Sequence, residues 1–230
     1  MLTPSEYLKR FNEMQQSTID ITRLVAKQIK PGLSELEIAD LYTEKLKEAG
    51  LKDHWYPILV YAGKLTGKPI SRRYHLPSPD VIVQENDIVM LDSTPLDKTV
   101  WSNWAETFLI GRNSFFESLI ADTRKVVEET YDFSVSEAKT ISDILDYCTS
   151  RITYYNLQSL DSRNDVGHSI FQVPEGQTVD QTPLSDRLFI NADYRDYPIT
   201  GIISIEPQLG RIDPENSKLF GAKIQKVIIR

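Results

Sequence analysis

The sequence is poor in cysteine and histidine. Cys148 is the one cysteine among 230 residues, which excludes an internal disulfide and a cysteine-based zinc cluster. The three histidines are His54, His75 and His168. A lone histidine more often has a structural role than a catalytic or metal-binding one. Each of the three therefore needs support from its neighbouring sequence before a catalytic or metal-binding role is assigned to it.

Long apolar runs and basic blocks are also missing. No stretch approaches the length of a membrane span, and the N-terminal residues lack the basic start and apolar run of a signal peptide. The net charge of −7, with no Lys/Arg-rich block, argues against a nucleic-acid surface. We therefore expect a cytoplasmic protein with neither a membrane nor a nucleic acid as partner.

The periodicity of apolar residues predicts two helices followed by strands, twice over. Ser34–Glu37 and Thr140–Asp143 are capping boxes that open the second helix of each half. Helices are predicted over residues 4–29, 34–50, 114–131 and 140–152. Strands are predicted over residues 55–61, 169–173, 188–191, 201–205 and 224–229, with a hairpin over 87–112. This order indicates one α+β domain, residues 1–230, with pseudo-repeat halves of roughly 1–112 and 113–230.

The hairpin carries the first chemical signal. An apolar run, Ile88 to Leu91, ends in Asp92, and Asn103 falls on the returning arm. A carboxylate after four apolar residues is costly to bury unless a cation or hydrogen bonds meet it. Asp92 is therefore a candidate ligand, and a hairpin can bring Asn103 to the same pocket.

Two further segments have a similar character. His168 lies in the segment Val-Gly-His-Ser-Ile, just ahead of an apolar strand. Glu206 ends the run Gly-Ile-Ile-Ser-Ile, and Pro207 stops that strand so that the side chain can face a pocket. An ordinary strand-end glutamate facing water is the competing interpretation.

Together these motifs resemble the creatinase/aminopeptidase ("pita-bread") superfamily, which includes methionine aminopeptidases, prolidases and Xaa-Pro aminopeptidases. The resemblance implies a curved, mainly antiparallel sheet backed by helices. It covers the catalytic-type domain, without the N-terminal domain that creatinase-type relatives carry. Homodimerisation is an expectation from the resemblance alone.

The resemblance also implies roles for residues that stand in the family's motif positions. The positions of metal ligands are taken by Asp92, Asn103, His168, Glu206 and Gln225. The positions of acid–base groups are taken by His75, Glu175 and Glu206. Three of these depart from the family pattern, because Asn103 and Gln225 replace carboxylates and Glu175 replaces a histidine.

Charge decides how much metal this set can hold. Asp92 and Glu206 supply two negative charges, half of what a full set would bring to a pair of divalent ions. Amide oxygens ligate weakly and do not bridge two cations as a carboxylate does. The sequence thus predicts at most one divalent metal, of the Mn, Fe or Zn type, and leaves a metal-free pocket open.

Three functions follow from this. The first is a hydrolase of the aminopeptidase P or methionine aminopeptidase type, acting on an amide or C–N bond of a small peptide-like substrate with one metal. The second is a metal-free enzyme similar to creatinase, which Glu175 favours as an additional acid–base group. The third is a catalytically inactive binding protein that kept the fold.

Overall fold

A computed structural model describes residues 2–71, 75–183 and 187–230. The helices are α1 (Pro4–Ala26), α2 (Glu35–Glu48), α3 (Ser114–Ser136) and α4 (Ile141–Tyr154), with short 3-10 turns η1 (Gly63–Gly67), η2 (Val179–Gln181) and η4 (Ala192–Tyr194). The four long helices agree with the predicted ones. The apolar stripes and the capping residues determine where these helices begin. At α2, for example, the Ser34 side chain accepts the Glu37 N–H and the Glu37 side chain accepts the Ser34 N–H.

Within the described residues, the strands form four three-stranded antiparallel sheets. In order along the chain, they are β1 (Asp53–His54), β2 (Leu59–Ala62), β3 (Asp87–Ser93), β4 (Pro95–Asp97), β5 (Val100–Trp101), β6 (Trp104–Ile110), β7 (Gln158–Ser159), β8 (Gly167–Ile170), β9 (Ile202–Ile205), β10 (Gln208–Ile212), β11 (Leu219–Lys223) and β12 (Lys226–Ile229). The sheets are β2-β3-β6, β1-β4-β5, β12-β9-β8 and β11-β10-β7. An isolated bridge between Glu106 and Ile224 links the strands of the first half to those of the second.

The predicted hairpin is present and lies at the centre of the first sheet. β3 pairs with β6 along its whole length and with β2 on its other edge, and all seven of its residues are buried. The segment between the two arms of this hairpin is itself ordered, because β4 and β5 pair with each other to form a small hairpin of their own.

Several predicted strands differ from the observed ones. The strand expected over residues 188–191 is only an isolated bridge between Phe189 and His168, and the one expected over 169–173 is shifted to Gly167–Ile170. The strand expected over residues 55–61 begins only at Leu59, since Pro57 has no N–H to donate to a neighbouring strand. The strand expected over 224–229 is interrupted at Gln225, between the end of β11 and the start of β12. This interruption matters for the site described below.

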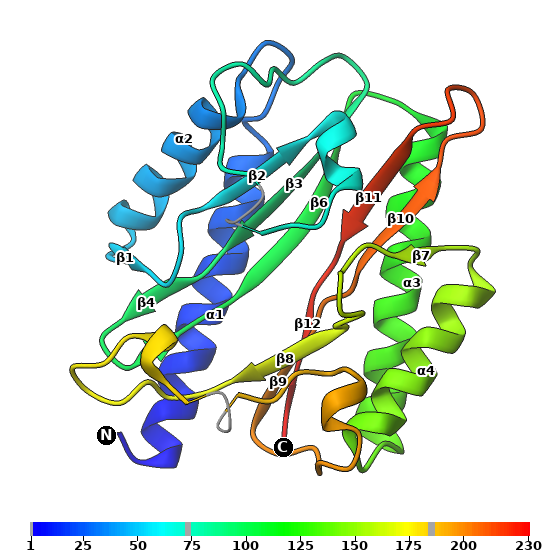
Figure 1. Cartoon of the computed structure of the whole chain (residues 1–230). Coiled ribbons are helices and arrows are strands. Elements are labelled where there is room, and N and C mark those ends of the chain that lie inside the picture. Colours follow the sequence, from blue (N-terminus) through cyan, green and yellow to red (C-terminus); the bar gives the residue numbers. More distant parts are fainter. Residues whose placement is uncertain (1, 72–74, 184–186) are drawn as a thin grey trace.

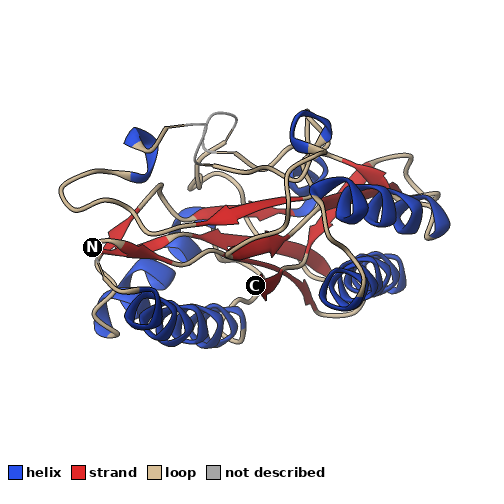
Figure 2. Ribbon diagram, turned by 90° about the horizontal axis from the view of Figure 1, so that it is seen from below, coloured by secondary structure: helices blue, strands red, loops and turns tan. Residues whose placement is uncertain are grey.

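Helices cover one side of the sheet layer. Figure 1 shows α1 and α2 beside the strands of the first half and α3 and α4 beside those of the second. Figure 2 shows the strands as a curved layer, with long helices below it and at its right-hand end and with loops and short helical turns above it. No helix in the described part of the chain is both long and apolar enough to span a bilayer.

Strand register decides which side each central residue faces. Asp92 pairs with Ala105 and Leu91 pairs with Glu106, so Asp92 and Glu106 point to opposite faces. Glu106 faces the helices, where its carboxylate contacts Arg23 of α1 at 3.1 Å and Arg124 of α3 at 3.5 Å. Asp92 therefore faces away from α1 and α3.

Candidate functional site

A cavity of about 560 Å³ opens on the side of the sheet that Asp92 faces. Its floor includes Asp92, Glu206 and His168 from the strands, and its walls come from loops in both halves of the chain. The wall residues include the aromatic side chains of Trp55, Tyr56 and Phe189 and the polar side chains of Ser71, Asp161, Arg163, Asp180, Arg187 and Gln208.

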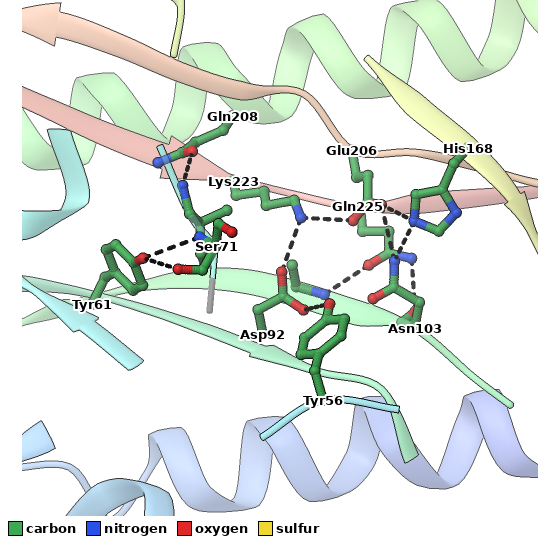
Figure 3. Close-up of polar contacts among 12 residues, drawn as sticks. Tyr56, Tyr61, Ser71, Asp92, Asn103, His168, Glu206, Gln208, Lys223 and Gln225 are labelled. Atoms are coloured by element: carbon green, nitrogen blue, oxygen red, sulfur yellow. Dashed lines mark hydrogen bonds and ion pairs between the residues drawn. The ribbon is translucent and has the colours of Figure 1, made fainter. Parts of the chain in front are cut away.

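An ammonium group lies between the two carboxylates on the cavity floor. Lys223, the last residue of β11, places its Nζ 3.0 Å from Oδ2 of Asp92 and 2.9 Å from Oε2 of Glu206 (Figure 3). Tyr56 donates its hydroxyl to the other oxygen of Asp92, Oδ1, at 2.9 Å. Each oxygen of Asp92 therefore already has a donor.

Glu206 is engaged in the same way. Its Oε1 lies 2.6 Å from Nε2 of His168 and accepts a hydrogen bond from Nδ2 of Asn103 at 2.9 Å. The other ring nitrogen of His168, Nδ1, lies 3.0 Å from the carbonyl oxygen of Ser169. An acceptor thus lies at each ring nitrogen of His168, and Nε2 also lies 3.1 Å from Nδ2 of Asn103. Trp101 stacks on the ring at a centroid distance of 5.9 Å.

Gln225 contributes to the cluster through the backbone. Its Oε1 accepts the N–H of Ala105 at 2.7 Å, and its Nε2 donates to the carbonyl oxygen of Asn103 at 2.7 Å. Both ends of the amide are thus used to hold β6 and the residue before it. As arranged, both amide groups of Gln225 are bonded within the protein, and its role as a metal ligand stays a prediction.

The electrostatics of the cluster favour its charged form. Burial alone would raise the pKa of Glu206, but Lys223 and then His168 overcome burial and lower that pKa to about 2. Burial would lower the pKa of Lys223, but Asp92 and Glu206 together raise it above its ordinary value. The pKa of His168 is raised as well, because Glu206 outweighs the effect of burial. These shifts favour the carboxylate form of Glu206 and the cationic forms of Lys223 and His168.

Such a set does not fit a divalent ion. Three of the four carboxylate oxygens of Asp92 and Glu206 accept hydrogen bonds from side chains, and the fourth, Oε2 of Glu206, has only the ion pair with Lys223 at 2.9 Å. Oδ1 of Asn103 is buried without a hydrogen-bond partner in the described structure, but a single neutral amide oxygen is a weak ligand. Within the described residues, no three His, Cys, Asp or Glu side chains are grouped to hold a metal.

The structure places the predicted site residues in two groups. It brings Asp92, Asn103, His168, Glu206 and Gln225 together, as the order of motifs indicated. It leaves two predicted acid–base groups elsewhere.

His75 and Glu175 are those two. Nε2 of His75 forms a short ion pair with the buried Glu35, and its ring packs edge-on against Tyr61. His75 was matched by its interval along the chain, but the segment that carries it folds back onto α2. Glu175 is exposed, in the turn where Gln177 N–H bonds to the carbonyl of Pro174.

Lys223 is the residue that the sequence prediction missed. A signal was present, because Lys223 is a lone charge within the apolar run from Leu219 to Ile224. It is also two residues before Gln225, and alternate residues of an extended segment share a face. A lysine on the same face as the expected ligands was therefore recognisable as a member of the cluster.

The fold and site define an α+β protein with a polar cluster and a cavity on one face of a curved antiparallel sheet. Residues 9–229 match the sequence pattern of metallopeptidase family M24. The chain therefore belongs to this family, and the predicted superfamily is confirmed.

A curated relative matches about half of the chain. A protein of Mycoplasma genitalium named "Putative Xaa-Pro aminopeptidase" is 32% identical over 118 residues, covering 49% of this chain and 32% of that protein. The chain thus spans about a third of the length of this relative.

Solved structures confirm the predicted pita-bread fold. An X-Pro aminopeptidase from Thermotoga maritima superposes with a TM-score of 0.73 at 17% identity, over 100% of this chain and 59% of that one. A methionine aminopeptidase from the same organism gives a TM-score of 0.72 at 18% identity, over 99% of this chain and 94% of that one. At these identities the likeness concerns the fold.

Proposed function

We propose that this chain is a member of family M24 that binds a small peptide or amide in its cavity without a divalent metal and does not hydrolyse it. The observation that carries this proposal is that Asp92, Glu206, Lys223 and His168 contact one another through their charged or polar groups. Hydrolysis of an amide needs an activated nucleophile or a general base with a free lone pair. In this cluster the carboxylates and the imidazole are already used by one another.

The cavity supports binding of a peptide-like ligand. Trp55, Tyr56 and Phe189 give it apolar walls, and a few polar groups converge on the floor, as in small-molecule sites generally. An ammonium has three N–H donors, of which the contacts with Asp92 and Glu206 use two. The remaining donor of Lys223 can bond to a carbonyl or carboxylate oxygen of the ligand.

The test measures binding and turnover on the same protein. Isothermal titration with a panel of Xaa-Pro and other dipeptides, in EDTA and then with added Mn²⁺, is paired with chromatography of the same mixtures. We expect binding that is equal in both conditions and no new amine or carboxylate product. Hydrolysis that appears only with Mn²⁺ would refute the proposal in favour of the one-metal hydrolase predicted from the sequence.

A metal-free hydrolase is the second candidate. It is favoured by the position of His168 and Glu206 side by side on the cavity floor, where a substrate could displace one of their mutual contacts. Turnover that persists in EDTA and is lost in His168→Gln would establish this candidate. The cytoplasmic location and the homodimer stay predictions.

A further inference from the structure

The ammonium of Lys223 lies between the carboxylates of Asp92 and Glu206, where a bound metal ion would otherwise lie. We propose that its ammonium is a built-in replacement for a divalent ion, and that removing it converts the cluster into a site for one metal. The inference concerns the same residues as the proposed function, but it does not depend on whether the cavity binds a peptide.

The burial of the three charges supports this assignment. Asp92, Glu206 and Lys223 are 2%, 6% and 8% exposed, so water screens their interactions poorly. Two buried carboxylates with no cation between them would repel each other and lose solvation at once. The folded chain therefore needs one positive charge at this point, and Lys223 delivers it from the end of β11.

The chain positions Lys223 tightly through its neighbours. The Lys223 N–H donates to Oγ1 of Thr107 at 2.8 Å, and Thr107 donates back to the Lys223 carbonyl at 3.0 Å. Gln208, opposite Lys223 in the β10–β11 pair, is itself held by the carbonyls of Thr66 and Lys68. The ammonium is thus presented by a paired strand, not by a free loop.

The remaining groups are chemically suited to a metal once the ammonium is gone. Asp92, Glu206 and His168 would offer two carboxylates and an imidazole, and Oδ1 of Asn103 is a buried acceptor with no partner in the described structure. Oxygen-rich sets with one imidazole suit Mn²⁺. The net charge of the cluster would also fall by one, which favours a cation.

The experiment titrates Mn²⁺ alone into the wild type and the Lys223→Ala variant of the full chain by calorimetry. We expect negligible binding to the wild type and about one equivalent in the variant. The affinity should be roughly 100-fold or more above that of the wild type, because a like charge about 4 Å away is removed. Thermal unfolding should respond in parallel, with Mn²⁺ raising the midpoint of Lys223→Ala and leaving that of the wild type unchanged.

Three further variants make the result specific. Lys226→Ala is the matched control, because Lys226 lies three residues further on and packs over the ring of Tyr131. It should gain no Mn²⁺ binding. Lys223→Ala combined with Glu206→Gln should lose the acquired site. Lys223→Met keeps the aliphatic stem of the side chain and should also acquire the site.

Each outcome decides the matter. If Lys223→Ala folds only when Mn²⁺ is present, the ion is replacing the ammonium and the proposal holds. If the wild type binds Mn²⁺ as tightly as the variant, the proposal is wrong. It is also wrong if Lys223→Ala and Lys223→Met are folded and bind none, or if both stay unfolded in excess Mn²⁺. None of these results depends on the dipeptide titrations that test the proposed function.

Discussion

The contact between His75 and the buried Glu35 predicts a measurable effect on stability. Glu35 of α2 is fully buried, and its Oε1 accepts the N–H of Ala62 at 2.8 Å. Its Oε2 faces His75 and, more weakly, the N–H of Ser78 at 3.4 Å. His75→Ala would therefore leave a buried carboxyl oxygen with one long hydrogen bond.

The size of the effect follows from burial. Removing one partner of a buried pair costs about 3–5 kcal/mol. The His75 side chain is 17% exposed, so water can reach the vacated position and the cost falls to the low end, about 3 kcal/mol. For a chain of 230 residues this corresponds to a midpoint about 6–12 °C lower.

Urea unfolding, monitored by circular dichroism, measures the loss of stability in His75→Ala. Glu35→Gln and the variant that combines both substitutions complete a double-mutant cycle. We expect the double variant to be less destabilised than the sum of the single ones, by about 1–2 kcal/mol. His54→Ala is the matched control, because neither ring nitrogen of His54 has a hydrogen-bond partner in the described structure. If His75→Ala loses dipeptide binding but keeps its stability, the reasoning is refuted and His75 acts at the cavity, as the sequence predicted.

Three further predictions concern other parts of the fold. Burial raises the pKa of Cys148 to about 12. At pH 8 roughly one thiol in ten thousand is then ionised, so a disulfide reagent should modify the native protein far more slowly than the protein in urea. A Cβ on Gly167 would lie 1.9 Å from the carbonyl oxygen of Ser204 in the neighbouring strand. Gly167→Ala should therefore lower the free energy of unfolding, measured by urea titration, by about 2 kcal/mol or more. An unchanged urea midpoint would contradict this prediction. Hydrogen bonds from the N–H groups of Lys139 and Thr140 lower the pKa of Asp143, so its stabilising effect is present above the unfolded pKa and is lost as the pH falls. The urea midpoints of wild type and Asp143→Asn should therefore converge below about pH 4, and a constant difference would argue against the cap.

Local sequence signals predicted much of the fold. The capping boxes at Ser34 and Thr140 and the hairpin around Asp92 depend on residues a few positions apart, and the structure contains them all. The convergence of Asp92, His168 and Glu206 was predicted from the order of motifs, because each ends or precedes an apolar strand. Whether residues 1–112 and 113–230 are repeats of one ancestral unit stays a prediction.

Long-range geometry could not be obtained in this way. His75 was placed by its interval before Asp92, but a loop of given length can turn toward the cavity or toward α2, and the buried Glu35 decides between them. The partner of the two carboxylates was expected to be a metal or an amide. The cation is Lys223, and its two carboxylate partners, Asp92 and Glu206, lie on other segments of the chain, so only the folded structure pairs them.

The ion pairs of Lys223 with Asp92 and Glu206 have a consequence for how this site depends on dissolved metal ions. A side-chain ammonium is synthesised with the polypeptide, so it is present once in every molecule and cannot dissociate, be stripped by a chelator or be exchanged for a competing ion. The shape of this cavity floor would therefore be the same in cells starved of manganese or zinc as in cells rich in them.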